Sequence, residues 1–282
     1  MATPFDLPAL RQCVLAASVI DGVDVVPHSR GIRLGSEGGP LVPWTELAPI
    51  AGDYPLASAT ARMRVAAFLG LRTLVHHLGH NAAWRLRTAA RLVALPADHV
   101  AHGGRDWVIE RLPGGTLDLG LGVVGLLGDP DAVHILPTPV LRACEVDGRE
   151  WWSDVRDHAD KMGGLAVSRL ARDSTPAFEP HRGSGAPREI VPWQRVLRPV
   201  GGCDVLALLA SRTLRRYLAG EDRSGMRAVA VPMRSRGWFD LCQIDPAFTA
   251  AAWAATDEIA RGVRRPLLIT EHEVAQARDR RG

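Results

Sequence analysis

Three histidines in the first third of the chain have a spacing that suits metal ligands. His76, His77 and His80 form the pattern H-H-x-x-H, and on a helix the first and last lie one turn apart, where both can bind one divalent ion. His99 and His102 are candidates for a third ligand. The pattern lacks the glutamate that acts as general base in the H-E-x-x-H zinc proteases. Surface histidines near a helix C-terminus are the alternative, which the sequence favours, and no other cofactor is indicated.

A second candidate is a cysteine at the predicted start of a helix. Cys203 follows Gly201-Gly202 and precedes Asp204, at a place where the helix dipole and free backbone N–H groups lower the pKa of a thiol. A nucleophile would also need a histidine, and the candidates in this half of the chain are His181 and His272. The sequence favours the alternative, a small thiol packed beside a glycine turn, with Asp204 as the helix cap.

Two arginines, Arg72 and Arg212, each follow apolar residues at helical spacing and should therefore approach the core. An unpaired guanidinium in the core is very costly, so each is expected to extend outward, pair with a carboxylate or bind an anion. If the two halves of the chain are related, the two arginines could also face one another's halves, as in a twofold-symmetric dimer.

Further arginines raise the question of nucleic-acid binding. The net charge is only +3, and Lys161 is the single lysine, an arginine usage that a GC-rich genome produces by codon bias alone. Acidic residues are nearly as numerous as basic ones, so solvated helix faces are favoured over a basic stripe. The residues that would form such a stripe, with two aromatic stacking surfaces, are Arg62, Arg64, Arg85, Arg87, Arg91, Arg215, Arg216, Trp84 and Tyr217.

Composition and length describe an ordinary globular chain. The residues are 46% hydrophobic and 23% charged, which is typical of globular proteins. A length of 282 residues suffices for one large domain or two ordinary ones, with a core that needs no disulfide or structural metal. The four cysteines are far apart and form no disulfide framework, which indicates a reducing compartment. The N-terminus lacks the pattern of a signal peptide, and no apolar run approaches the roughly 20 residues of a membrane span. We expect a soluble, cytoplasmic protein without a membrane partner.

The elements that must position these residues occur in two similar sets. Segments 41–52 and 190–201, which contain Trp44 and Trp193, share a V-P-W pattern followed by an apolar residue, proline and glycine. Similar pairs follow in the same order, and the offset between the two members falls steadily along the chain. This order predicts an internal duplication, with repeat units at 20–145 and 178–275 and a connecting segment at 146–177. Short coincidental matches in a chain rich in Arg, Leu and Ala are the alternative. The later pairs are 68–74 with 208–214, 91–96 with 227–232, and 107–108 with 238–239.

Periodicity predicts the individual elements and an α+β fold. Helices are expected at 58–78 and 82–92, from Cys203 or Asp204 to Gly220, and from Trp151 to about 171, with Ser153 as the cap of the last and Gly163-Gly164 as a weak point. The glycines of segment 117–122 are interpreted as strand residues that allow close packing, because no nucleotide-binding loop pattern surrounds them. Strands are expected at 92–95, 107–109, 117–127, 229–231 and 267–269.

These observations favour a pseudo-dimeric binding or regulatory protein, because structural residues recur in both halves while no catalytic group does. Its partner would be another protein or a small anionic ligand, with Arg72, Arg212, Trp44 and Trp193 as ligand or interface residues. One alternative is a hydrolase or transferase with a single site between the halves or around Cys203. The other is a nucleic-acid-binding protein that uses the arginine-rich helices.

Overall fold

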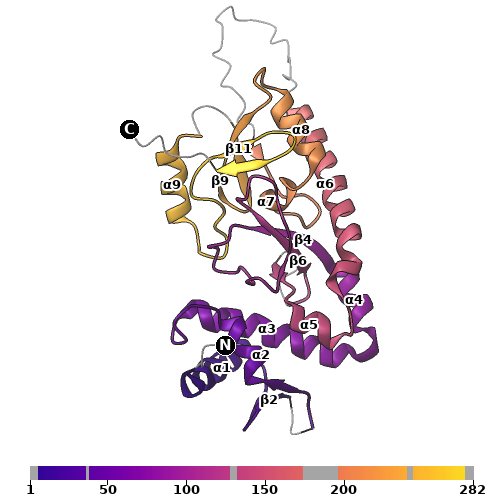
Figure 1. Cartoon of the computed structure of the whole chain (residues 1–282), viewed down its shortest axis with the longest axis vertical. Helices are drawn as coiled ribbons and strands as arrows, with labels where there is room; N and C mark the ends of the chain where they lie inside the picture. The colour runs from indigo at the N-terminus through magenta and orange to yellow at the C-terminus, as the bar shows by residue number, and fades with distance from the viewer. Residues whose placement is uncertain (1–5, 36–37, 128–131, 174–195, 240–243, 277–282) are drawn as a thin grey trace, which may run out of the picture. The chain divides into compact units, whose positions relative to one another are not determined.

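The computed structural model describes residues 6–35, 38–127, 132–173, 196–239 and 244–276 (Figure 1). The chain consists of helices and antiparallel sheets, which confirms the predicted α+β class. Among the described residues, no helix combines the length and the apolar character that a membrane crossing requires.

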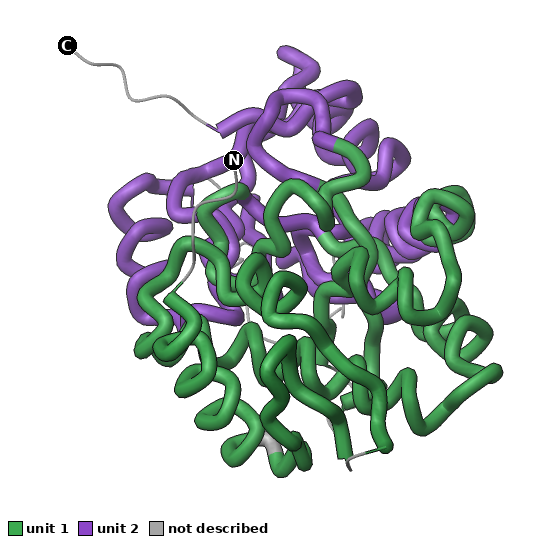
Figure 2. The backbone as a smooth tube through the Cα atoms, turned by 60° about the horizontal axis from the view of Figure 1, so that its bottom comes forward, with its two compact units in different colours: residues 1–93, 97–110, 119–155 green, residues 94–96, 111–118, 156–282 purple. Residues whose placement is uncertain are grey.

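The chain folds into two compact units (Figure 2). Unit 1 comprises residues 1–93, 97–110 and 119–155, and unit 2 comprises residues 94–96, 111–118 and 156–282. The chain passes from one unit to the other several times, whereas the predicted repeats at 20–145 and 178–275 are each continuous in sequence.

The core of unit 1 is built around helix α3 (Ala59–Leu78), which packs against α1 (Leu7–Asp21) and α2 (Trp44–Ala51). Apolar residues at helical spacing, including Val65, Phe68 and Leu69, are buried in this core. The helix begins where the sequence predicts, because the Ser58 hydroxyl accepts a hydrogen bond from the backbone N–H of Ala61 at 3.1 Å. Both predicted ends of α3 are thus confirmed.

A small antiparallel sheet joins α1 to α2. Its strands follow one another in the order β1 (Val25–His28), β2 (Gly31–Leu34) and β3 (Leu41–Pro43). Trp44 opens α2 directly after β3 and is buried, with its indole N–H donated to the carbonyl of His28 at 3.3 Å. Trp44 therefore joins this sheet to the helical core.

A second sheet has β6 (Asp118–Val124) between β4 (Ala90–Leu95) and β5 (Val108–Arg111), and β7 (Val133–Ile135) also pairs with β6. The predicted helix at 82–92 is shorter, because α4 (Ala82–Ala89) gives way to β4 at Ala90. Sheet pairing overrides helix propensity there. A Cβ on Gly120 or Gly122 would lie 2.4 Å from a neighbouring side chain, so the prediction that these glycines allow close packing is confirmed.

Short helices lie on both sides of this sheet in the sequence. η1 (Gly79–Asn81) precedes α4, while α5 (Thr138–Ala143) and η2 (Gly148–Trp151) follow β7 and lead into a long helix. The long helix α6 spans Trp152–Asp173, so Ser153 lies inside its first turn and is not the predicted cap. Gly163 and Gly164 do not interrupt α6. Because α6 continues directly from the 3-10 helix η2, its first turn needs no side-chain cap of its own.

Unit 2 contains a five-stranded sheet in the order β12-β11-β9-β10-β8. The predicted helix from Asp204 to Gly220 consists of two helices, α7 (Val205–Leu208) and α8 (Arg212–Gly220). The break occurs because Ser211 caps α8, accepting the N–H of Leu214 at 3.4 Å. Helix α9 (Pro246–Ala255) packs on β9. The strands are β8 (Val196–Leu197), β9 (Arg227–Met233), β10 (Arg236–Trp238), β11 (Leu267–Ile269) and β12 (Val274–Gln276).

The structure does not confirm the internal duplication. The matched segments 91–96 and 227–232 both form strands, but β4 pairs with β6 at a sheet edge, while β9 lies between β10 and β11. Arg72 lies inside α3, whereas Arg212 is the first residue of α8. Trp193, on which the comparison with Trp44 depends, lies outside the described residues.

Two adjacent glycines of α6 give a matched test of its packing. A Cβ on Gly163 would lie 2.4 Å from the Cβ of Ser211, whereas a Cβ on Gly164 would meet nothing within 4 Å. Gly163→Ala should therefore lower the free energy of unfolding by about 1–3 kcal/mol through overpacking. Gly164→Ala should raise it by about 0.5–1 kcal/mol through helix propensity. Urea denaturation of both variants measures this difference, and equal effects would contradict the packing.

Candidate functional site

A pocket of about 480 Å³ lies within unit 1, between the turn that leads into β5 and the turn that follows α5. Its apolar wall includes Trp107, Leu121, Leu136 and Leu141, all of which are buried. Six charged residues that are exposed to solvent also line it, namely Arg105, Asp106, Arg142, Glu145, Asp147 and Arg149. The pocket thus combines a desolvated apolar surface with charged groups at its opening, as ligand sites commonly do.

The indole of Trp107 is held in one orientation. Its Nε1–H donates a hydrogen bond to the carbonyl of Leu121 at 2.7 Å, so the polar atom of the ring is satisfied inside the protein. A Cβ on Gly120 would lie 2.4 Å from the indole, and one on Gly103 would lie 2.5 Å from the Cβ of Trp107. The ring of His102 meets the indole edge-on, with centroids 5.1 Å apart. Trp107 therefore presents a rigid apolar surface to the pocket.

Most of the charged groups of the pocket keep their hydrogen-bonding capacity. In the part of the chain that the structure describes, no side-chain hydrogen bond or ion pair involves the guanidinium of Arg105, Arg142 or Arg149. One carboxylate oxygen of Asp147 accepts the backbone N–H of Arg149 at 2.9 Å and so caps η2. The planar guanidinium groups remain able to bind a carboxylate or phosphate in a bidentate manner.

The first predicted ligand residue, Arg72, is a structural cation of unit 1. Its Nη1 donates to a carboxylate oxygen of Glu46 and to the carbonyl of Pro139, each at 2.9 Å. The side chains of Arg72 and Glu46 are only 11% and 17% exposed. The guanidinium thus reaches the core face as expected and is neutralised there, tying α3 to α2 and to α5.

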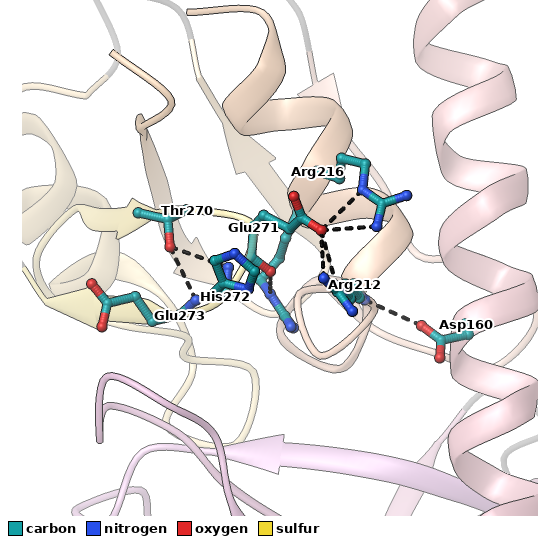
Figure 3. A network of polar contacts seen from close by, with 8 residues as sticks. Asp160, Arg212, Arg216, Thr270, Glu271, His272 and Glu273 are labelled. Atoms are coloured by element: carbon teal, nitrogen blue, oxygen red, sulfur yellow. Dashed lines mark hydrogen bonds and ion pairs between the residues drawn. The ribbon is translucent and has the colours of Figure 1, made fainter.

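The second, Arg212, belongs to a surface network of unit 2 (Figure 3). Arg212 and Arg216 project from α8 toward Glu271, in the turn between β11 and β12, and both donate to its Oε1 at 2.8 to 3.1 Å. Arg215 is buried and donates to the backbone carbonyl of Glu271. Since Arg72 and Arg212 each pair inside their own unit, the hypothesis that they face one another's halves is wrong.

Hydrogen bonds from Arg216, followed by those from Arg212 and the charges of both, hold the pKa of Glu271 below its ordinary value, while burial opposes this shift. A carboxyl with a lowered folded-state pKa stabilises the fold at pH values above its unfolded-state pKa. This contribution is lost as the pH falls through the folded-state pKa. The network is therefore a stabilising feature at neutral pH.

Cys203 and Asp204 occupy structural positions. Cys203 is fully buried, and its backbone forms two hydrogen bonds with Val200 across the glycine turn. One oxygen of Asp204 caps α7 by accepting the N–H of Ala207 at 2.8 Å, and the other pairs with Arg234 at 2.6 Å. These positions favour the structural interpretation of both residues. His181, a predicted partner, lies outside the described residues.

The three histidines lie on the surface where α3 ends and η1 begins. The rings of His76 and His77 are 5.8 Å apart, and His80 follows in η1. Within the described residues, no group of three or more His, Cys, Asp or Glu side chains is arranged to hold a metal ion. The exposed C-terminal position is the one that the alternative interpretation gave to these histidines.

The pocket was not predicted from the sequence, in which Trp107 was interpreted as part of a repeat pair and of a strand at 107–109. Its residues span positions 105 to 149 without a recognisable motif. The sequence signal was a tryptophan a few residues after Gly103-Gly104, together with the alternating glycines of the later segment 117–122.

Comparison of the chain with protein-family models, curated proteins and solved structures finds no match.

The two predicted arginines provide a test of burial against exposure. Arg72→Met should lower the free energy of unfolding by about 3 kcal/mol, because it leaves the half-buried carboxylate of Glu46 and a backbone carbonyl without their partner. Arg212→Met should leave it nearly unchanged, because its side chain is 59% exposed and Arg216 still pairs with Glu271. Chemical denaturation measures both variants. Similar losses in the two would contradict the assigned roles.

Proposed function

We propose that this is a non-catalytic binding protein whose unit 1 pocket takes a small organic molecule with an apolar body and an acidic group. The observation that carries this proposal is that one cavity of about 480 Å³ combines a rigid apolar wall with arginines that have no side-chain partner among the described residues. Cavities of known small-molecule sites range from about 300 to 1,000 Å³.

The apolar wall supports binding of a hydrophobic body. Trp107, Leu121 and Leu141 are buried at the pocket wall, so a ring or branched chain placed against them would move its own apolar area from water to an apolar surface. Because the indole is already fixed, little ordering would be needed when a ligand binds.

The arginines support recognition of an acidic group. Arg142 and Arg149 lie at the opening of the pocket and are exposed, so they keep the conformational freedom to close on a ligand. A carboxylate can accept two parallel hydrogen bonds from one guanidinium, and such charge-assisted bonds are stronger than neutral ones. The cellular location proposed for this activity is the cytoplasm, on the spacing of the four cysteines.

We expect 3-phenylpropanoate, which has an aromatic body and one carboxylate, to bind to the full-length protein in isothermal titration calorimetry. The double variant Arg142→Gln, Arg149→Gln should weaken this binding by about tenfold or more, since it removes charge-assisted hydrogen bonds. Arg85→Gln is the matched control, because Arg85 is exposed on α4 and does not line the pocket. Equal affinities of the double variant and the control would refute the proposed site.

A further inference from the structure

Glu145 has an unusual backbone conformation at the edge of the pocket. Its φ is +57°, and it is the one non-glycine residue with a positive φ among the described residues. L-residues with a side chain rarely occupy this left-handed region, because the Cβ approaches the following carbonyl oxygen.

The conformation belongs to the turn that ends α5. The N–H of Val146 donates to the carbonyl of Leu141 at 3.1 Å, and the N–H of Glu145 donates to the carbonyl of Arg142 at 3.0 Å. These two bonds form a Schellman motif, in which the left-handed position is usually glycine. At the end of α1, this chain does place a glycine, Gly22, at a φ of +62°. The turn after α5 therefore carries a glutamate where glycine would be less strained.

Glu145 belongs to the site described above. Glu145 lines the pocket, is exposed, and has no side-chain hydrogen bond or ion pair with any residue that the structure describes. Arg142, one helical turn before it, lines the same pocket. Among the described residues, a carboxylate and a guanidinium without side-chain partners thus line one cavity together. Strained backbone positions that persist without local benefit are concentrated at functional sites.

We infer that Glu145 determines ligand specificity by binding an ammonium group, so that the ligand class is an α-amino acid or related zwitterion with a large apolar side chain. This inference rests on the proposed function of the pocket. The carboxylate of such a ligand pairs with the arginines at the opening, the ammonium donates to Glu145, and the side chain lies against Trp107. The pocket thus offers a carboxylate to the ammonium group of the ligand and guanidinium groups to its carboxylate.

The test compares three molecules that differ by one group each: phenylalanine, 3-phenylpropanoate, which lacks the amine, and phenethylamine, which lacks the carboxylate. In calorimetry with the wild-type full-length chain, phenylalanine should bind about tenfold or more tightly than either of the others. Glu145→Gln should weaken phenylalanine binding by about tenfold and leave 3-phenylpropanoate unchanged. Glu150→Gln, an exposed neighbour that does not line the pocket, is the control and should change neither.

A second variant tests the strain. Glu145→Gly should raise the midpoint of thermal denaturation, because glycine adopts the left-handed region freely, while it removes the preference for phenylalanine. A lowered midpoint would overturn the argument from strain.

The outcomes separate the two proposals. If the wild type binds phenylalanine and 3-phenylpropanoate equally, or if Glu145→Gln weakens both to the same extent, the role of Glu145 is overturned and the pocket function stands. If none of the three molecules binds, the proposed function and this inference are both overturned.

Discussion

Arginine is almost the only basic residue of this chain, and burying its guanidinium requires that several N–H groups find acceptors at once. Both units bring backbone carbonyls to a buried arginine, and in unit 1 a carboxylate joins them. In unit 1, Arg72 binds Glu46 and the carbonyl of Pro139. In unit 2, the buried Arg215 donates to the carbonyls of Leu209, Ala210 and Glu271. Helix ends and turns are positioned by these contacts, because a misplaced carbonyl would leave a buried N–H without a partner.

The arginines of the unit 1 pocket differ from these buried arginines. The pocket arginines stay at the surface and have no protein acceptor among the described residues, although three carboxylates line the same cavity. Arg64, by contrast, is held in the protein by the carbonyl of His102, and burial lowers its pKa. Within the described residues, three exposed arginines around a pocket with both apolar and charged lining residues thus provide the donors that an external acidic group requires.

Close backbone approach is the second feature on which the site depends. Gly120 lets the indole of Trp107 approach β6 closely, and Gly148 brings the turn after α5 within reach of Leu121 and Leu141. Larger residues at these positions would displace the side chains that form the pocket wall. Rigid glycine contacts beneath the pocket and a strained glutamate at its edge together describe a preorganised site, in which the geometry is set before a ligand arrives.

The sequence by itself determined the features that depend on neighbours a few residues away. Asp204 was predicted to cap a helix, α3 was predicted to begin at about Ser58 and to end before Gly79, and the glycines of β6 were interpreted as packing residues, all in agreement with the structure. Caps and periodicity can be predicted because the atoms that form them lie within one turn of the chain. The α+β class follows from the same local patterns.

Only the tertiary structure decided which arginines are paired, where β4 displaces the end of a helix, and that residues from 105 to 149 enclose a cavity. Each of these depends on contacts between segments that are distant in sequence, such as Arg72 with Pro139 or Trp107 with Leu121. The left-handed backbone conformation of Glu145 could not be predicted from the sequence either, because the residue in this position after a helix is usually glycine. Long-range packing selects among conformations that local propensity leaves nearly equal in energy, and the candidate site is formed by such long-range contacts.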